Sequence, residues 1–142
     1  MPLALNPVKR LNASMILHPA VTIHGLAHAR AAIAPGLAVT LLSAPGAGLY
    51  AGCLWWRAVI DRVADESRVI SILDCADGAG QAMAALRAGV CNLVLWRETP
   101  GWESVAGIAA ARGGFVLSGA PPSLDLAEPG AARRLDAWLR AG

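Results

Sequence analysis

The chain has 142 residues, the size of one domain with a substantial core. Apolar residues make up 56% of it and charged residues only 15%, so burial against another protein chain would account for its scarce polar surface. The net charge is +2 and no long basic run occurs, which excludes a typical nucleic-acid-binding surface. We expect an irregular N-terminal arm over residues 1–20, interrupted by prolines, and a single folded domain over 21–142.

Cysteine usage and hydropathy indicate the cellular compartment in which the protein is expected. Cys53, Cys75 and Cys91 are odd in number and lack CxxC spacing, which favours a reducing compartment and predicts a cytoplasmic protein. The start of the chain lacks the basic and then apolar pattern of a signal peptide. The uncharged stretch Ala31–Trp56 is long enough to cross a bilayer, but prolines and glycines interrupt it, so no membrane contact is expected.

The pattern along the chain alternates between helical and extended segments. Val21–His24 is a short extended piece, and the run Leu37–Leu42, apolar on both faces, predicts a central strand of a parallel sheet. Further strands are expected at 69–73, 92–96 and 115–118. Helices are expected at Gly25–Ile33, Leu49–Glu66, Gly78–Ala88, about 100–112 and Gly130–Arg140, with Asp77 and Thr99 as N-caps.

Alternating units of this length indicate parallel strands joined by right-handed crossovers. Four strands are too few to close a barrel, so we predict an α/β fold, an open three-layer sandwich that resembles flavodoxin-like or Rossmann-like domains. The residues expected in its core are Val39, Leu41, Trp56, Ile60, Ile70, Ile72, Met83, Leu86, Val94, Val105, Ile108 and Val116.

The first candidate site is a glycine-containing turn between the first central strand and the next helix. Gly46-Ala-Gly48-Leu-Tyr-Ala51 matches G-x-G-x-x-G/A, and N–H groups at such a turn attract anions such as phosphate. With Gly46 and Gly48, Asp74 and Asp77 at the end of the second strand form the predicted cofactor-binding set, Asp74 standing where a ribose would bind. Alternatively, the glycines only permit a tight turn and close helix packing.

The second candidate is the group of polar residues that follow the strands: Ser43, Asp74, Cys75, Asp77, Arg97, Glu98 and Ser118. In a parallel sheet these gather on one rim, where open sheets bind ligands. Ser43 or Cys75 is a candidate nucleophile, with Asp74 as acid or base. No histidine is expected on that rim. The alternative is structural: Asp77 caps a helix and Cys75 is a small buried residue.

A third pattern is the spacing of His24 and His28, one helical turn apart, which can place two imidazoles on one metal. A third ligand is lacking, because His18 lies on the arm, so no metal site is predicted. The five tryptophans have the spacing of core or interface residues.

Three functions remain as hypotheses. The first is a non-catalytic module that self-associates as a dimer through Tyr50, Leu54 and part of Trp55, which point away from the buried side of their helix, and that binds a small anion at Gly46–Gly48. The second is a small hydrolase or transferase that uses Ser43, Asp74 and Cys75. The third is a truncated dinucleotide-binding domain. The sequence identifies no cofactor and leaves enzymatic activity open.

Overall fold

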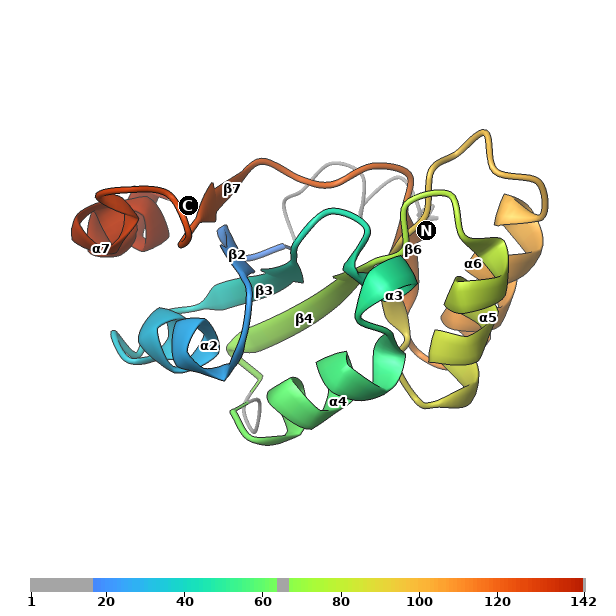
Figure 1. Cartoon of the computed structure of the whole chain (residues 1–142), viewed down its shortest axis with the longest axis horizontal. Coiled ribbons are helices and arrows are strands. Elements are labelled where there is room, and N and C mark those ends of the chain that lie inside the picture. The colour runs from blue at the N-terminus through green and yellow to red at the C-terminus, as the bar shows by residue number, and fades with distance from the viewer. Residues whose placement is uncertain (1–16, 64–66, 142) are drawn as a thin grey trace, which may run out of the picture.

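The computed structural model describes residues 17–63 and 67–141, so most of the predicted N-terminal arm lies outside the described residues. One parallel six-stranded sheet, with strand order β6-β5-β4-β3-β2-β7, runs through the molecule (Figure 1). The strands are β2 (Ala20–Ile23), β3 (Val39–Ser43), β4 (Val69–Asp74), β5 (Asn92–Val94), β6 (Phe115–Leu117) and β7 (Ser123–Asp125). The α/β class and the four predicted parallel strands are confirmed, and β2 and β7 are added to them.

The first predicted strand is interior, as its two apolar faces indicated. β3 lies between β2 and β4, with Ile23 opposite Ser43 and Val39 opposite Val69. All five residues of β3 are buried. One of its two polar residues, Thr40, donates from its hydroxyl to the His18 carbonyl at 2.8 Å, so the burial of that group is compensated.

The helices in the described ranges are α2 (Leu26–Ile33), α3 (Ala47–Tyr50), α4 (Cys53–Asp61), α5 (Ala79–Arg87), α6 (Trp102–Ala111) and α7 (Ala131–Ala141). Both predicted side-chain caps are wrong. Gly78 and Gly101 occupy the N-cap positions of α5 and α6, and neither helix has a side-chain cap. α6 begins two residues later than predicted because Trp102 N–H still bonds the Thr99 carbonyl in the preceding turn. Among the described residues, none of the helices has the length and apolar character needed to cross a bilayer.

The predicted helix Leu49–Glu66 is divided in two, and its last three positions lie outside the described residues. Gly52 separates α3 from α4 with a φ of 88°, a left-handed conformation that suits glycine. The break changes the helical phase, so Leu49 is exposed rather than part of the buried stripe. Trp56, Val59 and Val63 form the buried side of this region.

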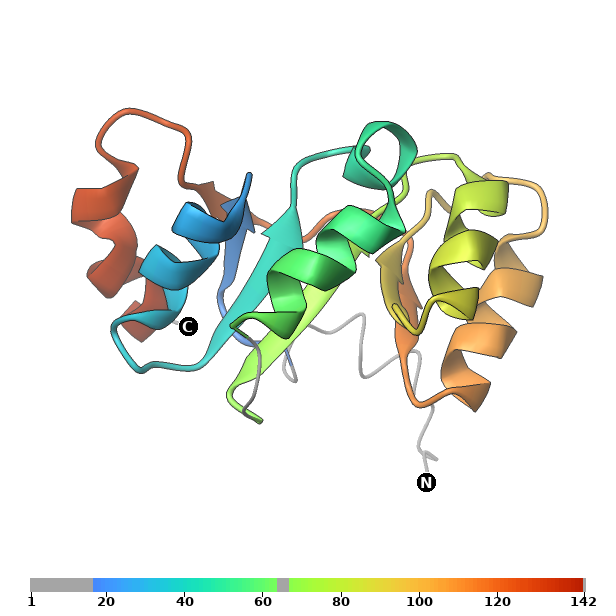
Figure 2. The ribbon, with the colours of Figure 1, turned by 60° about the horizontal axis from the view of Figure 1, so that its bottom comes forward.

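The two faces of the sheet are covered unequally. Because strands β2 to β6 follow one another in order, right-handed crossovers place their connecting helices on the same face. Figure 2 shows α2 and α4 in front of the strands on this face. The large core cluster includes buried residues of α2, α4, α5, α6 and α7. A smaller cluster on the opposite face consists of strand residues and Leu17: Leu42, Ile72, Val94 and Leu117 are buried in it, with Ile70, Phe115 and Leu17 packed against them.

The expected core is mostly confirmed. Eight of the twelve predicted residues are buried, and Ile60, Ile70, Met83 and Ile108 are half-buried against the core clusters.

The segment between β6 and β7 crosses from one edge of the sheet to the other (Figure 1). β7 then pairs with β2, where the Thr22 and Ser123 hydroxyls lie 2.7 Å apart.

Candidate functional site

Ser43 ends β3 and is buried beside the end of β4. Its Oγ accepts a hydrogen bond from the Asp74 backbone N–H at 2.9 Å and donates to the Ala44 carbonyl at 3.1 Å. The predicted proximity of Ser43 and Asp74 at the carboxyl ends of the strands is therefore confirmed. Both bonds hold backbone groups of the two strand ends, so the hydroxyl already has a structural role.

Asp74 ends β4, and only 3% of its surface is exposed. Its carboxyl group accepts the Ala76 N–H at 2.8 Å and also a hydrogen bond from the Gly46 N–H. Burial raises the pKa of Asp74, and the two N–H groups offset part of that rise. Ala76 has a φ of 49°, a left-handed conformation that is uncommon outside glycine, so this carboxyl group holds a strained turn.

The glycines of the turn after β3 have two distinct roles. Gly46 is left-handed, with a φ of 72°, and begins the single-turn helix α3. A Cβ atom on Gly48 would lie 2.7 Å from Cys75 Sγ and 3.1 Å from the Asp74 carbonyl oxygen. This contact supports the interpretation that the glycines permit a tight turn and close packing. The Gly46 N–H, which the motif offers to an anion, is used by the Asp74 carboxyl group of the same chain.

Cys75 follows Asp74 and is completely buried. Burial, together with the neighbouring Asp74 charge and Cys53, raises the pKa of the Cys75 thiol to about 12. The thiol is therefore protonated at neutral pH, whereas a nucleophilic cysteine needs its thiolate. Cys75 lies beside Ser43 and Asp74, as predicted, in an environment that suits a small packed side chain.

The other predicted rim residues lie at the surface. Asp77, Arg97, Glu98 and Ser118 are exposed. Asp77 does not cap α5, as described above. The Arg97 guanidinium carbon lies 4.3 Å from the centre of the Trp102 ring, a cation–π contact that orients this arginine along the loop before α6.

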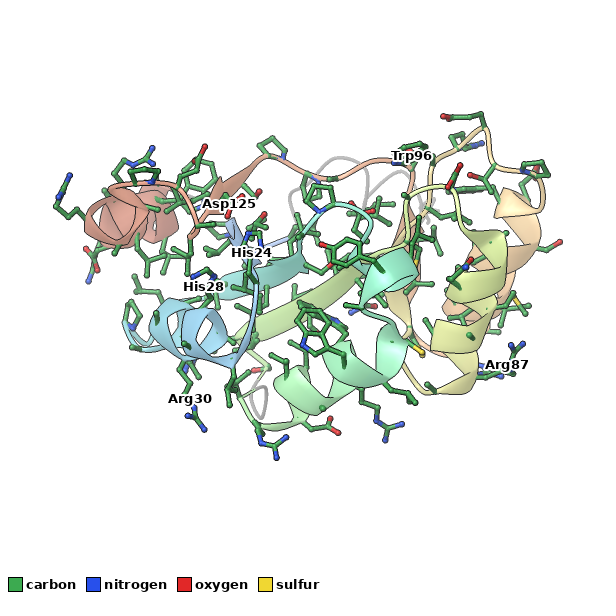
Figure 3. All side chains as sticks on the ribbon, viewed as in Figure 1. His24, His28, Arg30, Arg87, Trp96 and Asp125 are labelled. Atoms are coloured by element: carbon green, nitrogen blue, oxygen red, sulfur yellow. The ribbon has the colours of Figure 1, made fainter. Side chains whose placement is uncertain are left out.

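A histidine does lie on this rim, contrary to the prediction from sequence. β2 is a strand of the sheet, so His24 directly follows its carboxyl end. Its Nε2 lies 2.8 Å from Asp125 Oδ1 at the end of β7, and its backbone N–H donates to His28 Nδ1 at 3.1 Å (Figure 3). Burial acts to raise the pKa of Asp125, but the Ala127 N–H and His24 outweigh it and lower that pKa.

The His24–Asp125 pair escaped the sequence analysis because Pro121 and Pro122 concealed β7. The run Val21-Thr22-Ile23, rich in β-branched residues, was the available signal for β2. Within the described residues no group of three or more histidine, cysteine, aspartate or glutamate side chains could hold a metal ion. The structure thus brings together Ser43, Asp74, Cys75 and the Gly46–Gly48 turn, and separately His24, His28 and Asp125.

The fold and this rim define an open parallel α/β protein whose central strand ends are joined by their own polar groups. Comparison with models of known protein families, with curated proteins and with solved structures found no match to this chain.

Proposed function

We propose that the protein is a non-catalytic α/β module that self-associates through an apolar patch on α3 and α4. The observation that carries this proposal is the exposure of Leu49, Tyr50 and Leu54, by 42%, 71% and 73%. We call these three residues the α3–α4 patch. Large apolar side chains grouped on a surface mark contacts in many soluble proteins.

A second copy of the chain is the partner that the charge pattern favours. The patch lies within Ala31–Trp56, which contains no charged residue, so pairing the patch with itself brings few like charges together. A two-fold dimer uses the same surface on both copies and is the commonest closed oligomer. The free cysteines Cys53, Cys75 and Cys91 fit the reducing cytoplasm, where we place this dimer.

The enzyme and dinucleotide-binding hypotheses have less support. The Ser43 hydroxyl and the Asp74 carboxyl group hold backbone N–H groups, and the Cys75 thiol is protonated. An anion at Gly46–Gly48 would compete with Asp74 for the Gly46 N–H. Anion binding at this turn stays a prediction, and self-association does not depend on it.

Sedimentation velocity of the full chain at micromolar concentration tests the proposal. We expect a dimer, and we expect Tyr50→Glu/Leu54→Glu to sediment as a folded monomer. Fully burying one such side chain contributes about 1.5–3 kcal/mol, so losing two raises the Kd at least about 100-fold. The matched control is Ala110→Glu/Ala132→Glu, which adds two charges at exposed positions of α6 and α7 and should remain dimeric. A monomeric wild-type chain, or a dimer that survives both patch substitutions, would contradict the proposal.

A further inference from the structure

One face of the sheet carries apolar side chains over which none of the described helices packs. All buried apolar residues of the helices in the described ranges belong to the larger cluster on the opposite face. The apolar side chains of the other face come from β3, β4, β5 and β6, which are neighbours in the sheet. We call them the helix-free face: Leu42, Ile70, Ile72, Val94, Phe115 and Leu117.

The helix-free face is nevertheless shielded from water. Ile72 and Val94 are 0% exposed, and Leu42 and Leu117 are 3% and 5% exposed. Strand side chains stand out from the sheet, so neighbours within the same sheet shield only their flanks. Burial as complete as this requires chain that lies over the face, as the helices lie over the other face. Of the residues that the structure describes, Leu17 is the one apolar residue outside the strands that packs there.

The chain reaches the helix-free face immediately before β2, where Leu17 packs against it. The side chain of Thr40 lies on the same face of β3 as that of Leu42, because residues two apart in a strand share a face. The Thr40 hydroxyl donates to the His18 carbonyl at 2.8 Å, and the Thr40 N–H donates to the Pro19 carbonyl at 2.9 Å. These bonds hold the stretch against β3, so the chain that precedes it joins the fold on the helix-free side.

Residues 1–16 precede this point, and their length and composition suit the helix-free face. The four strands span about 15 Å at about 4.8 Å between neighbours, and sixteen extended residues reach about 50 Å. The charged side chains of the segment are the adjacent pair Lys9 and Arg10, so the apolar residues on either side can be buried without burying a charge. Those large apolar residues are Met1, Leu3, Leu5, Val8, Leu11, Met15 and Ile16.

We propose that residues 1–16 of the same chain lie over the helix-free face and bury it, opposite the helix layer. The segment continues from Leu17, which already packs there. Because it is joined to the face, it is always present at high effective concentration, whereas a second copy would lose translational freedom on association. The α3–α4 patch belongs to helices that pack on the other face, so this proposal stands whether or not the protein self-associates through that patch.

The test measures nuclear Overhauser effects in the full chain with ¹³C-labelled methyl groups of isoleucine, leucine and valine. We expect cross-peaks between methyl groups of residues 1–16 and those of Leu42, Ile72, Val94 or Leu117. A mixture of labelled and unlabelled chains identifies the occupant, because isotope filtering retains only contacts between different molecules. Contacts to this face that survive the filter would assign it to a second copy and overturn the proposal. Assigned spectra without any cross-peak between segment and face would equally overturn it.

Substitutions within the segment test whether the contact stabilises the fold. Leu11→Asp/Ile16→Asp should lower the melting temperature by at least about 5 °C, because two large side chains lose their burial. The matched control, Asn12→Asp/Ser14→Asp, adds the same charges at neighbouring polar positions and should lower it by less than about 2 °C.

Trypsin cleavage after Lys9 and Arg10 gives a second measurement on the same two variants. Cleavage follows the population of the opened segment, so it should be at least about 10-fold faster in Leu11→Asp/Ile16→Asp than in the control. Equal melting temperatures and equal cleavage rates in the two variants would overturn the proposal.

Discussion

The ends of β3 and β4 and the Trp56 indole on α4 differ in whether their buried polar groups have hydrogen-bond partners. At the carboxyl ends, the Ser43 hydroxyl and the Asp74 carboxyl group bond backbone N–H groups of neighbouring segments. Two other buried groups have no hydrogen-bond partner in the part of the chain that the structure describes, the Trp56 indole N–H on α4 and the Thr99 hydroxyl before α6. Open parallel sheets generally bind ligands at their carboxyl ends, so the fold directs attention to the first region. The Ser43 hydroxyl and the Asp74 carboxyl group are already paired, however, so they would gain little free energy from binding a ligand.

The largest expected effect tests whether Asp74 holds the carboxyl-end turns together. Asp74→Ala leaves the N–H groups of half-buried Gly46 and buried Ala76 without this acceptor and should cost about 2–4 kcal/mol of unfolding free energy. Asp74→Asn keeps a carbonyl oxygen and should cost less than half as much. Chemical denaturation of both variants measures this. Equal losses of unfolding free energy in the two variants would show that the hydrogen-bond acceptor of Asp74 does not account for its stabilising effect.

Comparison of the wild type with Asp74→Asn also predicts how the unfolding free energy depends on pH. The folded-state pKa of Asp74 is raised, so the folded state binds the proton more tightly than the unfolded state. Wild-type stability relative to Asp74→Asn should therefore be highest below the unfolded pKa of 3.8 and fall as the pH rises through the folded pKa. Unfolding free energies measured across this interval should show the decline, and an increase would contradict the raised pKa.

A smaller effect tests whether the glycine motif serves packing. Gly48→Ala places a Cβ 2.7 Å from Cys75 Sγ and should cost about 1–3 kcal/mol, as overpacking does. Gly80→Ala is the matched control, because its Cβ meets nothing within 4 Å on an exposed helix, and it should stabilise by about 0.5–1 kcal/mol. Combining Gly48→Ala with Cys75→Ala should recover part of the loss. A neutral Gly48→Ala would remove the packing explanation for this glycine.

The smallest effect compares two buried indoles. Trp56→Phe and Trp102→Phe remove the same atoms from buried sites, but among the described residues only the Trp102 indole has a hydrogen bond to lose. We expect Trp102→Phe to be more destabilising by about 1–2 kcal/mol, because it also leaves the Leu95 carbonyl without this donor. Thermal and chemical unfolding of both variants give the difference. Equal destabilisation would indicate that Trp56 also has a hydrogen-bond partner, and Trp56 would then no longer differ from the ends of β3 and β4.

Local sequence patterns were sufficient to predict much of the fold and the contacts at the carboxyl ends of the central strands. Uniformly apolar strands alternating with helical periodicity require a covered parallel sheet, and parallel strands bring their carboxyl ends together. The neighbourhood of Ser43, Asp74 and Cys75 follows from that geometry alone. What these groups do there could not be predicted, because it depends on backbone N–H groups that only the folded turns present.

The sequence by itself determined the α/β class, the interior position of β3 and most of the core, since each depends on the spacing of apolar residues along one segment. Tertiary structure decided the rest. Gly52 divides a helix that apolar spacing alone would continue, which exposes Leu49. His24 and Asp125, separated by 101 positions, meet only because β2 and β7 pair. Packing between distant segments likewise leaves the Trp56 indole N–H without a partner among the described residues, and no local pattern specifies which buried groups are left in this way.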